Sequence, residues 1–324
     1  MAMAVGLPKT LTILNSGHSM PLLGMGTAAF PVEPQDLVES AILSAIELGY
    51  THFDTASVYQ TEPTLGRAIR QALDRGLIAS RDNLFITTKL WIGHAERNLV
   101  VPALRESLQA LGLDYVDLYL IHFPAKLENS EKSFGVRSED LVPLDMKGTW
   151  QGMEECVRLG LAKSIGVSNF SCKKLSQILS FATIPPAVNQ VEMHPLWQQS
   201  KLRDFCAEKG IHVSAYSPLG GKNAPWGSNA VFDCEELKQV AQAKGKTLAQ
   251  ICLRWAYEQG VSFLPKSYNK ERLKENMEIF DWELSKDELK KMSALPQSRI
   301  FRGENLVSAD GLFKSVEDVW DGEV

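Results

Sequence analysis

The sequence predicts an α/β fold in the form of a closed (β/α)8 barrel, and three observations support this. Eight apolar segments, rich in β-branched or aromatic residues, alternate with segments of helical periodicity over about 260 residues. Most of these apolar segments end in polar side chains, which in a barrel gather on one rim. No Pro- or Ser-rich linker divides the chain, so we expect a single domain over residues 1–324. An open, doubly wound parallel sheet is the alternative fold.

The chain begins with a predicted β-hairpin, formed by residues 10–15 and 19–22 on either side of a Ser-Gly-His turn. The strands of the barrel follow, and each is an apolar extended run bounded by turn residues or by helical periodicity. We expect these strands at residues 22–26, 51–54, 84–89, 115–122, 163–168, 187–193, 212–217 and 262–266.

A helix is expected after each strand, because apolar residues recur there every three to four positions. Gly49 stops the first helix, whose apolar positions are Leu37, Val38, Ala41, Ile42, Ala45 and Ile46. We expect helices at residues 34–49, 62–75, 147–160, 172–181, 200–210 and 269–280, with a further one ending near residue 111 and two helical segments before Gly260.

Composition excludes several classes of function. The net charge is −5 and 44% of the residues are hydrophobic, so nothing favours nucleic acid or an anionic membrane surface as a partner. No apolar run approaches the ~18 residues of a membrane span, and the N-terminus lacks the features of a signal peptide. The five cysteines have no CxxC spacing and the histidines no metal-site spacing. We therefore expect a cytoplasmic protein with free thiols and no metal.

Four polar residues at the ends of three consecutive strand segments predict a proton-delivery site. They are Asp54, Tyr59, Lys89 and His122. A phenol with its ordinary pKa of ~10 is a poor acid at neutral pH, but a nearby ammonium stabilises the phenolate and lowers that pKa. We expect Lys89 to supply this charge, Asp54 to keep Lys89 protonated, and Tyr59 to protonate a developing alkoxide. A neutral His122 can hydrogen-bond the carbonyl group of a substrate.

The hydride for such a reaction has to come from a bound nicotinamide, because no side chain supplies one. A second cluster, made of Lys266, Ser267 and Arg272, lies where a strand end turns into a helix. Such a place suits a phosphate monoester. Two charge-assisted bonds of ~1.5–3 kcal/mol each would favour NADP over NAD by roughly 10²–10⁴.

The GMGTAA run at residues 24–29 matches the G-x-G-x-x-A dinucleotide fingerprint. That fingerprint requires glycines that open a helix, but here the helix can begin only near Pro34. We therefore interpret the glycines as a tight strand exit that allows a ligand to approach the backbone.

Several segments closely resemble the aldo-keto reductases, and the match extends from about residue 10 to the C-terminal segment. They are GMGT (24–27), HFDTA (52–56) with Tyr59, LYLIH (118–122), GVSNF (166–170), NQVE (189–192) and the run from Lys266 to Asn276. Three further segments are similar to the plant group that contains chalcone reductase, codeinone reductase and deoxymugineic acid synthase. They are MEEC (153–156), KSYN (266–269) and IFDWEL (279–284).

The resemblance implies a TIM barrel that binds NADPH across its rim and transfers the hydride to the carbonyl of an aldehyde or ketone. By position, Tyr59 is implied to be the proton donor, and Lys89 and Asp54 tune it. The implied cofactor-binding residues are Gly26, Thr27, Asp54, Ser168, Asn169, Gln190, Tyr216, Ser217, Leu219, Lys266, Ser267, Arg272, Glu275 and Asn276. Within this set the resemblance implies contacts with the carboxamide (Ser168, Asn169, Gln190), the nicotinamide face (Tyr216), the pyrophosphate (Ser217, Leu219), the 2′-phosphate (Lys266, Ser267, Arg272) and the adenine (Glu275, Asn276).

Two positions depart from the family pattern, in which many members carry Trp. Ala28 follows the Gly-Thr pair and Phe123 follows His122. Smaller side chains there predict a wider pocket and a bulky carbonyl substrate, such as a plant specialised metabolite. Residues 125–146, 220–234 and 296–324 are expected as irregular segments over the rim, the last as a C-terminal loop. The candidate substrate-binding residues are Ala28, Trp91, His122, Phe123, Trp226 and Phe301, and Phe134 and Trp197 are further candidate pocket walls.

The predicted partner is a small-molecule carbonyl compound, and the predicted protein is a monomer. Two alternatives remain beside the reductase. One is an NADP-dependent alcohol dehydrogenase that runs in the oxidative direction. The other is a non-catalytic NADPH-binding barrel, of the kind that the family's potassium-channel β subunits and lens crystallin relatives represent. The presence of all four residues of the proton-delivery site favours an enzyme.

Overall fold

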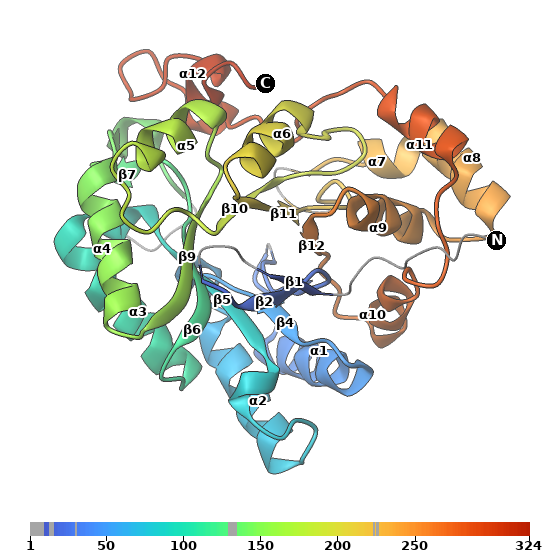
Figure 1. Cartoon of the computed structure of the whole chain (residues 1–324), viewed down its shortest axis with the longest axis horizontal. Coiled ribbons are helices and arrows are strands. Elements are labelled where there is room, and N and C mark those ends of the chain that lie inside the picture. Colours follow the sequence, from blue (N-terminus) through green and yellow to red (C-terminus); the bar gives the residue numbers. More distant parts are fainter. Residues whose placement is uncertain (1–9, 13–15, 30, 129–134, 223, 225–226) are drawn as a thin grey trace.

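The described residues of the computed structural model, which are 10–12, 16–29, 31–128, 135–222, 224 and 227–324, contain one parallel sheet of eight strands (Figure 1). Every strand of this sheet lies beside the one that precedes it in the chain, as in a barrel and unlike a doubly wound sheet. The strands are β3 (Met25–Gly26), β4 (His52–Asp54), β5 (Phe85–Leu90), β6 (Val116–Ile121), β9 (Ala162–Ser168), β10 (Val188–Glu192), β11 (His212–Tyr216) and β12 (Ser262–Leu264).

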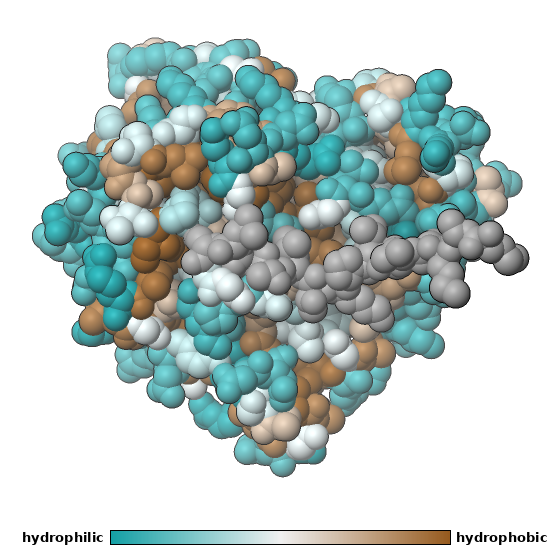
Figure 2. Space-filling model, viewed as in Figure 1, coloured by the Kyte–Doolittle hydropathy of each residue, from teal (hydrophilic) through white to brown (hydrophobic). Residues whose placement is uncertain are grey.

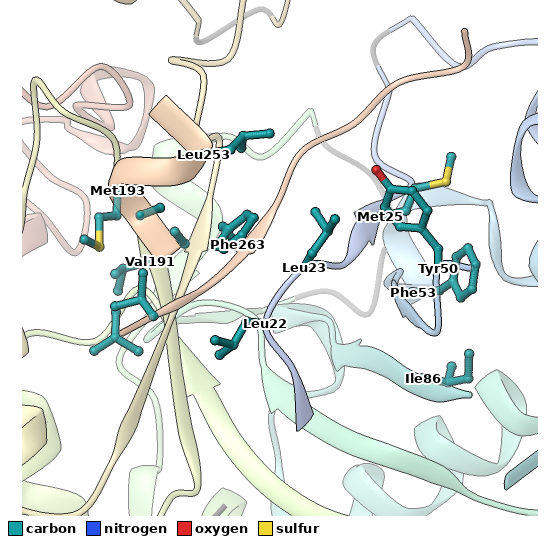
Figure 3. Packing of buried hydrophobic residues seen from close by; sticks show 14 of the residues in the cluster. Leu22, Leu23, Met25, Tyr50, Phe53, Ile86, Val191, Met193, Leu253 and Phe263 are labelled. Carbon is teal, nitrogen blue, oxygen red and sulfur yellow. The ribbon is translucent and has the colours of Figure 1, made fainter. Parts of the chain in front are cut away.

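The first and last strands meet and close the barrel. Leu23 and Phe263, which Figure 3 labels, form a parallel bridge. The backbone N–H of Gly24 donates to Phe263 O at 3.0 Å, and that of Phe263 donates to Leu22 O at 2.7 Å. One step further along, Gly26 N donates to Pro265 O at 3.1 Å. This seam confirms the predicted closed barrel and excludes the doubly wound alternative.

Helices surround the strands on the outside of the barrel, as Figure 1 shows. Their apolar faces pack on the strands, and the large buried side chains Trp150, Trp255 and Phe170 fill this layer. The helices of the barrel units are α1 (Gln35–Leu48), α2 (Glu62–Asp74), α3 (Arg97–Leu111), α4 (Met146–Arg158), α5 (Cys172–Leu179), α6 (Ser200–Glu208), α8 (Glu235–Lys244), α9 (Leu248–Glu258) and α10 (Lys270–Met277).

The predicted N-terminal hairpin is confirmed for its described residues. Strands β1 (Thr10–Thr12) and β2 (Ser19–Pro21) pair antiparallel, whereas residues 13–15 lie outside the described residues. In the view of Figure 1 the hairpin lies over the middle of the barrel. On the same face, Figure 2 shows hydrophilic side chains over most of the outer helices, with hydrophobic atoms gathered between them.

The three segments predicted as irregular contain some regular structure, and one helix was not predicted at all. Strands β7 (Lys126–Leu127) and β8 (Leu141–Val142) form a small ribbon, and short helices α7 (Ala230–Asp233) and α12 (Val316–Trp320) lie in the other two segments. Helix α11 (Lys286–Ser293) begins with a capping box made by Ser285 and Glu288. These elements are short, so their periodicity is too weak to reveal them from sequence.

Gly24 owes its place to packing inside the barrel rather than to a ligand, which corrects our interpretation of this glycine. A Cβ on Gly24 would lie 2.7 Å from both Nδ1 of His52 and Cδ2 of Leu264. Of these two glycines, Gly26 borders the cavity described below and Gly24 does not. A Cβ on Gly26 would lie 3.4 Å from Leu264 O.

One buried and one half-buried histidine, His52 and His212, keep neutral rings inside the barrel. His52 bonds through Nδ1 to Pro21 O at 3.0 Å, and Nε2 of His212 accepts the backbone N–H of Ser262 at 3.1 Å. Burial lowers the pKa of His52, and it lowers the pKa of His212 to about 3. An accepting Nε2 cannot carry a proton, so protonation of His212 would break its bond to Ser262.

The free energy of unfolding should therefore fall as the pH drops below the unfolded histidine pKa of about 6.5. In that range the unfolded chain binds protons that the folded chain excludes. Replacing His212 with glutamine should reduce this slope by about 1.4 kcal/mol per pH unit between about pH 6 and pH 4. Urea unfolding at several pH values tests this, with His18→Gln at an exposed hairpin position as the control. Equal slopes in wild type and His212→Gln would contradict the prediction.

Candidate active site

The four residues of the predicted proton-delivery site converge at one end of the barrel. Asp54 ends β4, Lys89 lies in β5, and His122 follows β6 directly. Tyr59 ends a single 3-10 turn, Ser57–Tyr59, that follows β4. Parallel strands deliver their carboxyl ends to the same rim, which explains why these separate segments meet.

The Lys89 ammonium is fully buried and makes contacts with three of its neighbours. It donates to Oδ1 of Asp54 at 2.5 Å, to the backbone O of Thr55 at 3.0 Å and to the Tyr59 hydroxyl at 3.4 Å. Burial lowers the pKa of Lys89, while the charge of Asp54 and its hydrogen bond oppose that change. The second oxygen of Asp54 accepts from Nε2 of Gln190 at 2.8 Å. The Asp54–Lys89 pair is thus held on both sides.

The pKa of Tyr59 lies well above 10, because burial disfavours the phenolate and the Asp54 carboxylate adds to this effect. The prediction that Lys89 lowers the pKa of Tyr59 is therefore wrong for the protein without a bound ligand. Asp54 contacts Lys89 more closely than Tyr59 does, so its charge offsets most of the ammonium's field at the phenol. Tyr59 therefore keeps its proton at neutral pH.

His122 is neutral, since burial and the charge of Lys89 hold its pKa well below 6.5. Its Nε2 lies 3.2 Å from the Tyr59 hydroxyl oxygen, and its ring packs edge-on against Trp91 with centroids 5.3 Å apart. Nδ1 has no hydrogen-bond partner among the described residues. Because Nδ1 faces no acceptor there, the single proton of the ring is better placed on Nε2. The His122 N–H and the Tyr59 hydroxyl then lie beside each other in the wall of one cavity.

A chain of polar groups continues from this site along the next strand ends. Tyr216 at the end of β11 donates its hydroxyl proton to Oδ1 of Asn169 at 2.8 Å. The amide nitrogen of Asn169 donates to His122 O at 3.0 Å and to Ser168 Oγ at 3.1 Å. Asn169 and Ser217 have φ values of 65° and 47°, which turn the chain sharply out of β9 and β11.

Apart from Lys89, which does not line it, these groups border one cavity of about 1200 Å³. It is lined by three members of the tetrad Asp54, Tyr59, Lys89 and His122, namely Asp54, Tyr59 and His122, and also by the second predicted cluster, Lys266, Ser267 and Arg272. Of the other predicted site residues, it is also lined by Gly26, Ala28, Trp91, Phe123, Ser168, Asn169, Gln190, Tyr216, Ser217, Leu219, Glu275, Asn276 and Phe301.

Some predicted site residues lie elsewhere. Thr27 is fully buried behind the cavity wall, where its hydroxyl bonds to Asp54 O at 3.0 Å. Trp197 does not border the cavity; its ring packs on the Arg299 guanidinium, 4.9 Å from the ring centroid. Phe134 and Trp226 lie outside the described residues.

Sequence reasoning missed several residues that line the cavity. They are Ile92, Val136, Leu141, Thr247, Leu248, Ala249, Arg302, Glu304, Asn305 and Leu306. The sequence held a signal for Thr247, Leu248 and Ala249, because Thr247 and Gln250 form a capping box that marks the start of α9. Thr247 also donates to the carboxylate of Glu275 at 2.6 Å, which joins the start of α9 to the last turn of α10 in the cavity wall.

The part of the cavity wall formed by Lys266 and Arg272 carries positive charge. Within the described part of the chain, neither Lys266 nor Arg272 forms an ion pair with a carboxylate. Lys266 Nζ lies 5.0 Å from the ring centroid of Tyr268, and Asn269 caps α10 by accepting the Arg272 N–H at 2.9 Å. Two cations and a capped helix start suit a phosphate group.

Over the described ranges, no helix is long and apolar enough to cross a membrane. Nor does that part of the chain bring together three or more His, Cys, Asp or Glu side chains that could hold a metal ion.

Comparison with known proteins gives one consistent result. The model of the Aldo/keto reductase family matches residues 22–296. The 7-acetyl-epi-neemfruitin B aldo-keto reductase of Melia azedarach is 54% identical over 324 residues and the match covers 100% of both chains. Deoxymugineic acid synthase 1-D of Triticum aestivum is 53% identical over 94% of this chain and 97% of its own. A solved aldo-keto reductase of Bombyx mori in complex with NADP has a TM-score of 0.82 and 38% identity, over 92% of this chain and 95% of that chain.

Proposed function

The chain belongs to the aldo/keto reductase family, and we propose that it reduces the carbonyl of a bulky aldehyde or ketone with NADPH and uses Tyr59 as the proton donor. The observation that carries this proposal is the convergence of the protonated Tyr59 hydroxyl and the neutral His122 ring on one cavity. Lys89 and Asp54 form a buried ion pair directly behind them.

NADPH, when bound, supplies the hydride that adds to the carbonyl carbon. The Tyr59 hydroxyl gives its proton to the carbonyl oxygen, so that an alcohol forms and the phenol is left as a phenolate. The Lys89 ammonium, 3.4 Å from the hydroxyl oxygen, stabilises that phenolate. The His122 N–H hydrogen-bonds the same carbonyl oxygen and selects which face of the substrate turns toward the cofactor.

The cavity fits a dinucleotide phosphate. We propose that Ser168, Asn169 and Gln190 hold the carboxamide near the tetrad and that Tyr216 stacks on the nicotinamide. We propose in the same way that Ser217 and Leu219, which also line the cavity, contact the pyrophosphate and that Glu275 and Asn276 contact the adenine. Lys266 and Arg272, which have no carboxylate partner among the residues that the structure describes, suit the 2′-phosphate with Ser267. The NADP complex of the Bombyx mori relative supports this choice of cofactor.

Arg272→Ala should weaken NADPH binding by about 10- to 150-fold, the equivalent of one charge-assisted bond of ~1.5–3 kcal/mol, and should leave NADH binding nearly unchanged. Titration of each coenzyme by fluorescence quenching measures both dissociation constants. Lys274→Ala is the matched control, since Lys274 is an exposed cation on the same helix that does not border the cavity. An equal loss of affinity for both coenzymes would contradict a 2′-phosphate contact.

The walls near the tetrad support a bulky, largely apolar substrate. Trp91, Phe123, Leu141 and Phe301 line this part of the cavity, and at Ala28 the wall carries only a methyl group. The relatives named for acting on 7-acetyl-epi-neemfruitin B and (1S)-1,7-diacetoxy-luvungin A support a plant specialised metabolite as the substrate class. A panel from short aldehydes to polycyclic ketones tests this proposal. Equal efficiency on short aldehydes and failure on every polycyclic ketone would contradict it.

We further propose that the reaction runs in the reductive direction, in a cytoplasmic monomer. The five cysteines are free thiols, as expected in a reducing compartment. Turnover of NADP⁺ with the product alcohol, compared with turnover of NADPH with the carbonyl, tests the direction, and size-exclusion chromatography tests the oligomeric state.

A further inference from the structure

Glu192 anchors the C-terminal segment, residues 296–324, to the rim of the barrel. This buried carboxylate accepts the backbone N–H groups of Ile300 at 2.7 Å and Phe301 at 2.8 Å, and Nε2 of His194 at 2.9 Å. Glu192 lies two residues after Gln190 on β10, so both side chains project from the same face of the strand. The strand that holds Asp54 through Gln190 thus also fixes the position of Phe301.

Trp320, the last residue of α12, lies behind two walls of the cavity. Its ring packs edge-on against Phe123 and Phe301, with centroid distances of 5.9 Å to each and interplanar angles of 81° and 82°. Phe123 and Phe301 border the cavity, but Trp320 does not. Only 3% of Trp320 is exposed, and its indole N–H donates to Arg302 O at 2.8 Å.

Helix α12 is itself held in place from the outside. The Arg299 guanidinium lies 3.7 Å from the centroid of the Trp320 ring and donates to the backbone O of Glu323 at 3.1 Å. Asp321, directly after Trp320, accepts the Ser171 hydroxyl at 2.6 Å and pairs with Lys174 of α5. Figure 1 shows α12 next to α5. Trp320 therefore cannot move away without breaking these contacts.

We propose that Trp320 is a specificity-determining residue, which sets the separation of Phe123 and Phe301 without touching the substrate. Protein interiors are close-packed, so an aromatic side chain that packs behind others keeps them in place. Removing the Trp320 ring would therefore let Phe123 and Phe301 move back from the cavity. A wider gap accommodates bulky carbonyls but loses contacts with slim ones. This inference rests on the proposed carbonyl reduction.

The test compares Trp320→Ala and the smaller change Trp320→Phe with wild type. The two probes are a short straight-chain aldehyde and a polycyclic ketone, each with saturating NADPH. In Trp320→Ala we expect the ratio of kcat/KM for the ketone over the aldehyde to rise about tenfold or more. The change should lie mainly in KM, because Tyr59 and His122 stay in place. Trp320→Phe should shift the ratio in the same direction by less.

Trp282→Phe is the matched control. The Trp282 indole N–H also donates to a backbone carbonyl, that of Glu278 at 3.0 Å, and a cation, Lys246, lies 5.3 Å from its ring. Trp282 does not border the cavity, so its replacement should leave the ratio unchanged. NADPH affinity should be unchanged in all variants.

Three results would overturn the inference, and each has a different meaning. If wild type reduces both probes and the ratio stays within about twofold in folded Trp320→Phe and Trp320→Ala proteins, the inference alone fails. If wild type with bound NADPH reduces no carbonyl of the panel, the proposed function fails and the inference falls with it. A fall in kcat for both probes with an unchanged ratio would assign Trp320 a purely structural role.

Discussion

Tyr59→Phe should lower kcat for carbonyl reduction by about 10²–10⁴-fold, while the dissociation constant for NADPH stays within a factor of about two. The change removes one hydroxyl whose pKa lies well above 10 and which therefore carries its proton at neutral pH. It leaves the ring, the cavity walls and the cofactor cluster around Lys266 untouched. The loss should lie in kcat rather than KM, because the proton moves only as charge develops on the carbonyl oxygen.

NADPH consumption measured under saturating substrate, together with coenzyme titration, checks this result. Tyr119→Phe is the matched control: Tyr119 is a buried strand tyrosine three residues before His122 that does not border the cavity. Unchanged turnover in a folded Tyr59→Phe protein would mean that another group protonates the substrate. Turnover that falls together with NADPH affinity would instead place Tyr59 in cofactor binding.

Lys89→Met should abolish measurable reduction and also lower the free energy of unfolding by about 3–5 kcal/mol at neutral pH. Methionine preserves the approximate shape of lysine but leaves the buried Asp54 carboxylate without its cation. Among the described residues, the donor that remains to that carboxylate is the Gln190 amide at 2.8 Å. An uncompensated buried charge is costly, whereas the loss of a complete ion pair is not.

The double variant Asp54→Asn/Lys89→Met separates stability from chemistry. It should recover most of the lost unfolding free energy because no unpaired charge remains, yet it should stay inactive because no ammonium stabilises the phenolate. Urea unfolding and turnover of all four proteins in the cycle provide the measurement. A Lys89→Met protein as stable as wild type, or an active double variant, would contradict the role assigned to the pair.

Much of the fold was readable from the sequence because its signals are local and repeated. The periodicity of α1 and the stop at Gly49 predict that helix to within a residue or two of its observed bounds. The eight strand positions and the closed barrel are confirmed in the same way. Short elements such as α12 and the β7–β8 ribbon depend on contacts with the finished barrel, so their own residues give little sign of them.

The pKa of Tyr59 shows where residue types alone mislead. The presence of Lys89 predicts a lowered pKa, but burial and the position of Asp54 reverse the sign. Electrostatic effects depend on distance and on exposure to water, and neither can be taken from a list of residues.

The sequence by itself determined the barrel, the identity of Asp54, Tyr59, Lys89 and His122, and the cationic cluster from Lys266 to Arg272. It could do so because these residues lie at or near strand ends or a helix start, which local pattern marks. Only the tertiary structure decided that His122 and Tyr59 are both in their uncharged forms and that Glu192 holds Phe301 over the rim. It also decided that Trp320, 197 positions after Phe123, stands behind that residue. Burial and contact across such separations in the chain arise only when the whole barrel closes.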